Sequence, residues 1–145
     1  MENTKKIIFA SDHAGLNLKR VLMDYFRPNY EIIDVGTKET SSCDYPIYAK
    51  NLCIKVLELE ALGILICGTG IGMSIAANRY KGIRAALCLN EYMAEKARQH
   101  NNANVLCLGE RVVGVDLAKS IAQTFLTTPF EGERHLRRIE LIENL

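Results

Sequence analysis

The chain has 145 residues, the length of one ordinary domain, which is enough to bury a core without disulfide or metal staples. Its 18 Lys and Arg residues nearly balance its 17 Asp and Glu residues, so no overall field attracts a polyanion, and we expect no nucleic-acid partner and no membrane partner. With 48% hydrophobic and 24% charged residues, the composition is that of a globular protein, and we expect a single domain over residues 1–145.

Short apolar runs alternate along the chain with longer segments of helical period. In chain order, the pattern predicts a strand at 7–10, a helix at 16–26, a strand at 31–35, a helix at 46–62, a strand at 63–67, a helix at 71–80, a strand at 83–89, a helix at 91–100, a strand at 105–108, and helices at 111–125 and 134–145. Four of the strands are almost wholly apolar, as in a sheet covered on both faces. The alternation predicts an α/β fold, a Rossmann-like three-layer sandwich around a five-stranded parallel sheet.

Neither a signal peptide nor a membrane span is expected. The apolar run at 7–10 leads directly into Ser-Asp-His, and no run approaches the roughly 18 apolar residues of a membrane helix. The five cysteines lie 10, 14, 21 and 19 positions apart, which matches neither paired zinc ligands nor a compact disulfide framework. We therefore expect a cytoplasmic protein with free thiols.

The residues that follow the predicted strands are unusually polar. Ligands of parallel sheets bind beyond the carboxyl ends of the strands, so these positions are the first place to look for a site. We expect five segments to share this edge of the sheet: Ser11 to Gly15, Gly36-Thr37, Cys67 to Gly72, Asn90-Glu91 and Gly109 to Arg111.

The turn from Cys67 to Gly72 is the most informative of these segments. Alternating glycines between a buried strand and a helix allow successive N–H groups to converge on one anion. No Lys follows, as a P-loop requires, and a dinucleotide fingerprint fits poorly because Met73 stands where its third glycine is needed. Glu91, about 20 residues further on, is the one feature that supports a dinucleotide site. A tight turn that binds no ligand is the remaining alternative.

Cys67 directly precedes these glycines, where main-chain donors favour a thiolate. A thiolate beside an oxyanion site suits either nucleophilic attack or removal of a weakly acidic C–H proton, because both reactions develop negative charge on a neighbouring oxygen. The other cysteines are interpreted as three core residues and one loop thiol: Cys53, Cys88, Cys107 and, in the loop, Cys43.

Three other candidates each have two interpretations. His100 closes a predicted helix, where it either contacts the helix dipole or takes part in chemistry. Arg134 and Arg138 are four positions apart and share one helical face. They form either a solvated cluster of charges or a pair of guanidinium groups that binds phosphate. Asp12 is either a site residue or, as an alternative to Ser11, the N-cap of the helix that begins at Leu16.

Six segments occur in order over essentially the whole chain: SDHAG at 11–15, CDYP at 43–46, CGTGIG at 67–72, IAANRYKGIRA at 75–85, RQHNNANVL at 98–106 and GERHLRRIE at 132–140. Together they resemble the ribose-5-phosphate isomerase B family, which also includes the subunits of galactose-6-phosphate isomerase. Because the match is spread along the chain, it is more specific than any single motif.

The resemblance implies a role for each matching residue. Cys67 is implied as the base that moves a proton between C1 and C2 of the sugar, and His100 as the group that opens the furanose ring. Further residues are implied to hold the enediolate (Gly68, Thr69, Gly70, Ile71, Gly72), the sugar hydroxyls (Asp12, Asn101) and the phosphate (His13, Arg111, Arg134, Arg138), and to line the pocket (Tyr45). One branch of the family lacks this cysteine and uses an acidic residue at the place of Met73. Because this chain has Cys67, it resembles the branch that uses the cysteine.

The implied reaction interconverts D-ribose 5-phosphate and D-ribulose 5-phosphate, in the non-oxidative branch of the pentose phosphate pathway, without cofactor or metal. A homodimer, or a dimer of dimers, is implied, in which the C-terminal helix packs on the partner subunit and the site combines Cys67 of one chain with Arg134 and Arg138 of the other. Galactose 6-phosphate and allose 6-phosphate stay open as substrates. A non-catalytic nucleotide- or phosphosugar-binding domain stays open as another class of function.

Overall fold

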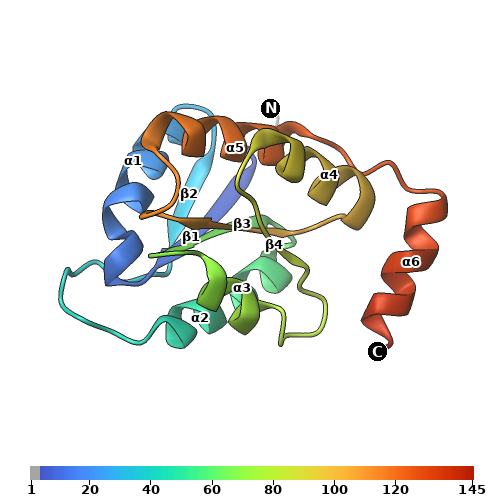
Figure 1. Ribbon diagram of the computed structural model, residues 1–145, viewed down its shortest axis with the longest axis horizontal. Helices are drawn as coiled ribbons and strands as arrows, with labels where there is room; N and C mark the ends of the chain where they lie inside the picture. The colour runs from blue at the N-terminus through green and yellow to red at the C-terminus, as the bar shows by residue number, and fades with distance from the viewer. Residues whose placement is uncertain (1–3) are drawn as a thin grey trace.

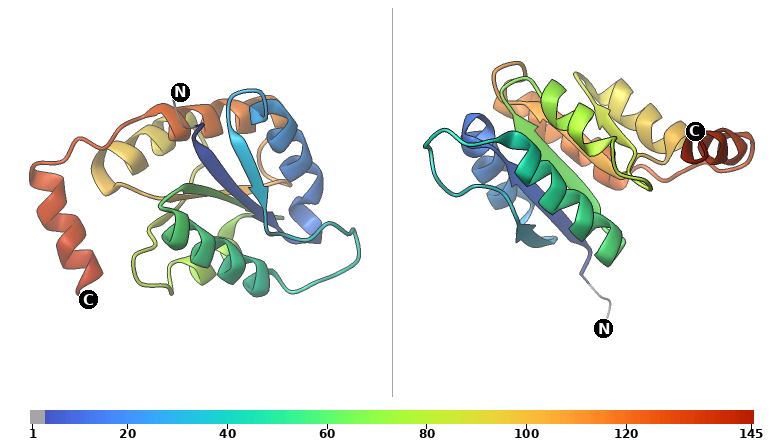
Figure 2. Two further views of the ribbon diagram at one scale, coloured as in Figure 1. Left: turned by 180° about the vertical axis from the view of Figure 1, so that it is seen from behind. Right: turned by 90° about the horizontal axis from the view of Figure 1, so that it is seen from below.

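The computed structural model describes residues 4–145, which form a sheet of five parallel strands in the order β2-β1-β3-β5-β4. The strands are β1 (Lys6–Ser11), β2 (Glu31–Asp34), β3 (Leu62–Cys67), β4 (Ala85–Leu87) and β5 (Val105–Gly109). The helices are the 3-10 turn η1 (His13–Gly15), α1 (Leu16–Phe26), α2 (Tyr45–Leu59), α3 (Ile71–Ala77), α4 (Glu91–Asn101), α5 (Val115–Thr127) and α6 (Arg134–Glu143). Helices cover both faces of the sheet (Figures 1 and 2), so the predicted three-layer α/β fold is confirmed. Over residues 4–145, no helix has the length and apolar character needed to cross a membrane.

The central strands are buried on both faces because successive apolar side chains point to opposite sides. In β1, Ile7 and Phe9 belong to the core formed with α1, α4 and α5, whereas Ile8 and Ala10 belong to the core formed with α2 and α3. All four residues are fully buried. Burial of apolar surface contributes about 25 cal/mol per Å², so such strands require a helical layer on each side.

The fourth strand is shorter than predicted, since Ala85–Leu87 forms β4 instead of 83–89. Ile83 and Cys88 are buried, which extends the apolar pattern beyond the strand. However, Gly82 has a φ of +88° and Ile83 donates its N–H to the carbonyl of Tyr80 at 3.1 Å, so the chain is still turning at residue 83. Burial alone therefore predicted strand where the backbone forms a turn.

Three predicted helix boundaries were wrong, and one of them affects the site. The helix predicted from Arg111 begins at Val115, because the N–H groups of Val112 and Val113 both donate to the Gly109 carbonyl at 3.0 Å and close a turn. Arg111 thus lies in a loop at the sheet edge. The second helix ends at Leu59 instead of residue 62, since Glu60 is left-handed with a φ of 51°, and α3 ends at Ala77 instead of residue 80.

The terminal helix α6 lies at one end of the molecule, against α4 (Figure 1). Glu143 near its end accepts hydrogen bonds from Arg84 Nη1 at 2.6 Å and from the Gly82 N–H at 3.0 Å. Ile139 is buried within the chain, but the other apolar side chains of the helix are 50%, 64% and 46% exposed: Leu136, Leu141 and Ile142. The chain by itself therefore buries only part of the apolar face of α6.

Candidate active site

The carboxyl ends of β1, β3 and β5 meet at one edge of the sheet, as the sequence predicted. Asp12 donates its N–H to the carbonyl of Ile66 at 3.3 Å, and Glu110 donates its N–H to the carbonyl of Cys67 at 2.9 Å. These bonds hold the loops after the three strands side by side. The candidate residues at this edge form what we call the carboxyl-edge group: Asp12, His13, Tyr45, Cys67, Gly68, Thr69, Gly70, Ile71, Gly72 and Arg111.

Cys67 is the last residue of β3 and is 6% exposed. Its Sγ accepts a hydrogen bond from the Gly70 N–H at 3.1 Å, and Thr69 Oγ1 accepts one from the Ile71 N–H at 3.2 Å. Gly70 has a φ of +80°, a conformation that side chains rarely adopt, and a methyl group there would come within 2.9 Å of the main chain of Leu108. Two N–H groups of the predicted anion-binding turn thus donate within the turn, one to Cys67 Sγ and one to Thr69 Oγ1. The Gly70 N–H can stabilise negative charge on the sulfur.

The three cysteines interpreted as core residues are buried in the structure. Burial raises the pKa of Cys53 and of Cys88 to about 12. Burial, with a smaller contribution from the neighbouring cysteines, raises the pKa of Cys107 well above its ordinary value. These three side chains are therefore thiols at neutral pH and are poor nucleophiles and poor bases.

Asp12 and His13 are both oriented by main-chain N–H groups. Asp12 Oδ1 accepts from Ala14 at 3.0 Å and from Gly15 at 3.2 Å, so Asp12 caps the 3-10 turn η1. The prediction that it caps the helix at Leu16 was wrong, because the N-cap of α1 is Gly15, which has no side chain to accept a hydrogen bond. His13 Nδ1 accepts from the Cys43 N–H at 3.3 Å. In the neutral ring, the proton then resides on Nε2, which remains able to donate to an anion.

Tyr45 and Arg111 lie directly against the turn that follows Cys67. A methyl group on Gly72 would come within 2.7 Å of the Tyr45 ring, and one on Gly68 would come within 3.1 Å of Arg111 Nη1. Arg111 also donates its N–H to the carbonyl of Gly68 at 3.0 Å. The glycines therefore give the phenol and the guanidinium room to approach the backbone that holds the sulfur.

Lys19, a residue for which the sequence pattern predicted no role, supports this edge of the sheet. Its side chain is fully buried, and Nζ donates to both carboxylate oxygens of Asp34 at 2.8 and 2.9 Å and to the carbonyl of Thr37 at 2.6 Å. The ion pair fixes the start of the loop that leads to Tyr45. Helical spacing could have predicted that Lys19 is buried, because it is three positions from both Leu16 and Leu22, which are buried.

The remaining candidates lie at the opposite, amino end of the strands, and we call them the amino-edge group: His100, Asn101, Arg134 and Arg138. Helix α4 runs from the carboxyl end of β4 back toward the amino ends of the strands. Shortly after the helix ends, the carbonyl of Asn104 accepts a hydrogen bond from the N–H of Gly63, which lies near the start of β3. The five residue-to-residue steps of β3 from Leu62 to Cys67 span about 17 Å. Figure 1 shows α6 at one end of the molecule and the loop between β2 and α2 at the other. One chain therefore does not bring Cys67 and His100 together.

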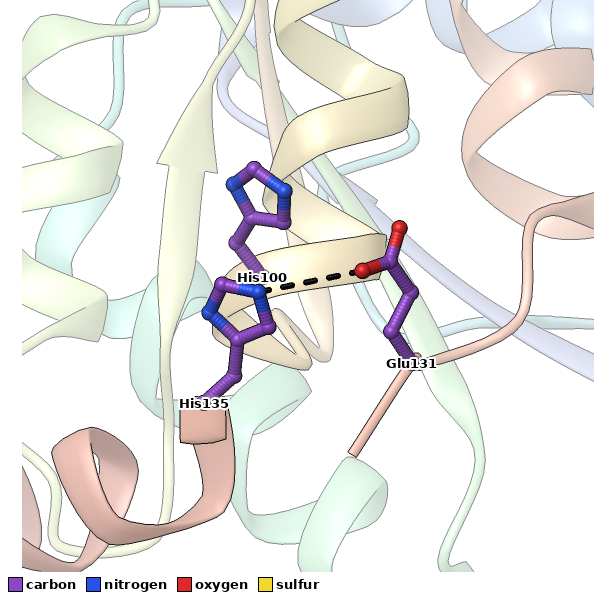
Figure 3. Close-up of side chains that lie close together, drawn as sticks. All are labelled: His100, Glu131 and His135. Atoms are coloured by element: carbon purple, nitrogen blue, oxygen red, sulfur yellow. Dashed lines mark ion pairs between the residues drawn. The ribbon is translucent and has the colours of Figure 1, made fainter. Parts of the chain in front are cut away.

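His100 lies beside two residues that the sequence pattern left without a function, His135 and Glu131. Its ring stacks on that of His135, with centroids 4.3 Å apart and planes 14° apart, and His135 Nε2 lies 3.7 Å from a carboxylate oxygen of Glu131 (Figure 3). Burial, followed by the charges of Arg134 and His100, lowers the pKa of His135. The four-residue spacing of Glu131 and His135 was visible in the sequence, but the contact with His100 is tertiary.

Comparison with known proteins shows the same similarity along nearly the whole chain. A family model described as Ribose/Galactose Isomerase matches residues 7–142. Ribose-5-phosphate isomerase B of Escherichia coli (strain K12) is 47% identical over 140 residues, which are 95% of this chain and 94% of the relative. A putative sugar phosphate isomerase of Bacillus subtilis (strain 168) is 47% identical over 144 residues, 96% of this chain and 95% of the relative. The crystal structure of a ribose 5-phosphate isomerase from Thermotoga maritima superposes with a TM-score of 0.95 at 53% identity and covers 99% of this chain and 100% of that one.

Proposed function

Because the chain belongs to the ribose/galactose isomerase family, we propose that it is an aldose–ketose isomerase that interconverts D-ribose 5-phosphate and D-ribulose 5-phosphate. The observation that carries the chemistry is the environment of Cys67. Its sulfur lies at the carboxyl edge of a parallel sheet, 3.1 Å from the Gly70 N–H and beside the exposed Thr69. A base and hydrogen-bond donors at one point are what proton transfer next to a carbonyl requires.

In the proposed reaction, the Cys67 thiolate removes the proton from C2 of the open-chain aldose. The C–H electron pair forms the C1–C2 double bond, and the carbonyl electrons move to O1, which gives an enediolate. The Thr69 hydroxyl and main-chain N–H groups of the turn stabilise the negative oxygen. Cys67 then returns the proton to C1, where the electrons of the C1–C2 double bond form the new C–H bond. The proton of the C2 hydroxyl passes to O1, and the electron pair left on O2 forms the carbonyl of the ketose, so that protons and electrons balance without a redox partner.

Ring opening and phosphate binding are assigned to residues of both edges. We assign protonation of the furanose ring oxygen to His100 and contacts with sugar hydroxyls to Asn101 and Asp12. His13 and Arg111 at one edge and Arg134 and Arg138 at the other are assigned to the phosphate, since guanidinium groups bind its oxygens in pairs. The proposed site therefore needs residues of the carboxyl-edge group and of the amino-edge group, which lie at opposite edges of the sheet in a single chain.

A homodimer is proposed as the arrangement that completes the site. In a two-fold dimer, the carboxyl-edge group of one chain meets the amino-edge group of its partner, and the dimer has two equal sites. Exposed apolar side chains near both groups support this arrangement: Ile47, Ile71 and Ile75 on α2 and α3, and Leu136, Leu141 and Ile142 on α6. The five free cysteines support a reducing compartment, and we assign the enzyme to the cytoplasm.

Purified protein is expected to convert ribose 5-phosphate to ribulose 5-phosphate at an undiminished rate in excess EDTA. The reason is that the proposed steps use a thiolate, an imidazole and hydrogen-bond donors, none of which needs a metal ion. A coupled assay for the ketose measures the rate, with galactose 6-phosphate and allose 6-phosphate tested in parallel. Activity that disappears with EDTA and returns with a divalent ion contradicts the mechanism, and turnover confined to a hexose phosphate contradicts the substrate.

Replacement of His100 by asparagine is expected to separate ring opening from proton transfer. Turnover of ribose 5-phosphate, which is mainly a closed furanose, should fall at least about 10²-fold, as for loss of a general acid. Ribulose 5-phosphate cannot close through its phosphorylated O5, so exchange of its C1 proton with D₂O needs only Cys67. NMR should show that this exchange falls much less than turnover. Equal losses of turnover and exchange would assign His100 a purely structural role.

A further inference from the structure

We propose that His100, Glu131 and His135 bind a divalent transition-metal ion, Zn²⁺ in the first place, and that the bound ion inhibits isomerisation by withdrawing His100 from ring opening. Metal binding is inferred from the geometry of the three side chains alone. The inhibitory effect rests on the proposed function.

Three separate elements bring one ligand atom each to the same point. His100 comes from the last turn of α4, Glu131 from the segment before α6, and His135 from the first turn of α6 (Figure 3). Their ligand atoms lie within 4.8 Å of one another. Tetrahedral Zn²⁺ with bonds of 2.0–2.2 Å holds its ligand atoms about 3.4 Å apart, so the ligand atoms must approach one another by about 1.4 Å at most. The His100 ring must also turn out of its stack on His135, because a metal ion lies in the plane of each imidazole that binds it. The Glu131 side chain is 44% exposed and His100 is only partly buried, so both can rotate toward a fixed His135.

His135 provides an independent reason to expect a ligand at this point. The residue is 4% exposed, and among residues 4–145 its buried Nε2 has no hydrogen-bond partner. The Glu131 carboxylate is 3.7 Å away, which is too far for a hydrogen bond. A buried polar atom without a partner is unfavourable, and a metal ion between the imidazole and the carboxylate would satisfy both groups.

The ligand set indicates which ions fit. Two imidazoles and one carboxylate form the His₂Glu set of open zinc sites, in which a fourth position is left for water or another ligand. Mg²⁺ and Ca²⁺ prefer oxygen ligands and are poor candidates. A metal-bound imidazole must be neutral. Coordination uses the His100 lone pair and leaves the ring unable to accept and donate a proton.

Zinc binding to the full-length, EDTA-stripped protein tests the site by calorimetry without substrate. We expect Glu131→Gln to weaken Zn²⁺ binding at least about 10-fold, since even outer-shell changes cost that much. Glu133→Gln is the matched control, because it makes the same charge change two residues away on an exposed side chain outside the cluster. Equal affinity of the two variants for Zn²⁺ would overturn the site. Co²⁺ complexes supply a second measurement, since thiolate-to-cobalt charge-transfer bands in the spectrum would overturn the site in the same way.

The inhibitory effect is tested on the same proteins. Wild type and Glu133→Gln should lose activity as Zn²⁺ is added and regain it with EDTA, whereas Glu131→Gln should keep its basal activity and need at least about 10-fold more Zn²⁺ for the same inhibition. Tight binding at the cluster without inhibition overturns this half of the inference. If the protein has no isomerase activity, the proposed function fails, but the calorimetric difference between the two variants still decides the metal site.

Discussion

Replacing Cys67 by alanine is expected to lower the turnover of ribose 5-phosphate at least 10²- to 10⁴-fold, as is typical for a lost general base, which corresponds to roughly 3–5 kcal/mol of activation free energy. Alanine leaves the Gly70 N–H in place but removes the atom to which it donates at 3.1 Å. The three core thiols cannot replace it, since Cys53, Cys88 and Cys107 are buried with raised pKa values. Steady-state kinetics in both directions measure the loss.

Cys88→Ala is the matched control, because it deletes the same group from a residue that is 1% exposed in the core. It should cost about 1 kcal/mol of unfolding free energy through the small cavity and leave turnover nearly unchanged. Thermal unfolding of Cys67→Ala should remain cooperative. Near-normal turnover of Cys67→Ala would contradict the proposed base, since no second candidate lies on the turn.

Two inactive proteins are expected to restore activity when they are unfolded together and refolded. One carries Cys67→Ala at the carboxyl edge, and the other carries Arg134→Ala with Arg138→Ala at the amino edge. Random pairing makes about half of the dimers mixed, and each mixed dimer has one intact site of two, so about a quarter of wild-type activity should return. The isomerase assay measures the recovery, and mass spectrometry of the intact dimers confirms the mixing.

The control for this experiment combines two defects of the same edge. Arg111 lies against the Cys67 turn, so a mixture of Cys67→Ala with Arg111→Ala contains no intact site and should stay inactive. A site contained in one chain predicts no recovery in either mixture. Inactivity of the first mixture, once mixed dimers are shown to be present, therefore contradicts the shared site.

The sequence predicted the layers of the fold well, because the signals are local and strong. Strands such as 63–67 are apolar on both faces, and the helices between them have clear periodicity, so parallel pairing under two helical layers follows. Boundaries failed where a turn contains buried apolar residues. Val113 and Ile83 are both buried, yet each belongs to a turn closed by main-chain hydrogen bonds that composition does not reveal.

The residues of the candidate site also fall into two sets, those whose place the sequence predicted and those whose place it did not. The sequence by itself determined the turn after Cys67, since its glycines allow a tight turn, and Gly70 has a φ of +80°, which side chains rarely adopt. It also determined that Asp12, His13 and Arg111 follow strand ends, which in a parallel sheet lie at one edge.

Only the tertiary structure decided where the other residues lie. His100 ends a helix that returns to the start of the strands, so its distance from Cys67 depends on how α4 packs, not on its place in the sequence. The stack of His100 on His135 and the approach of Glu131 depend on how α6 docks on α4. Such contacts join segments about 30 residues apart through side-chain packing, whereas a sequence pattern records only the periodicity within each segment.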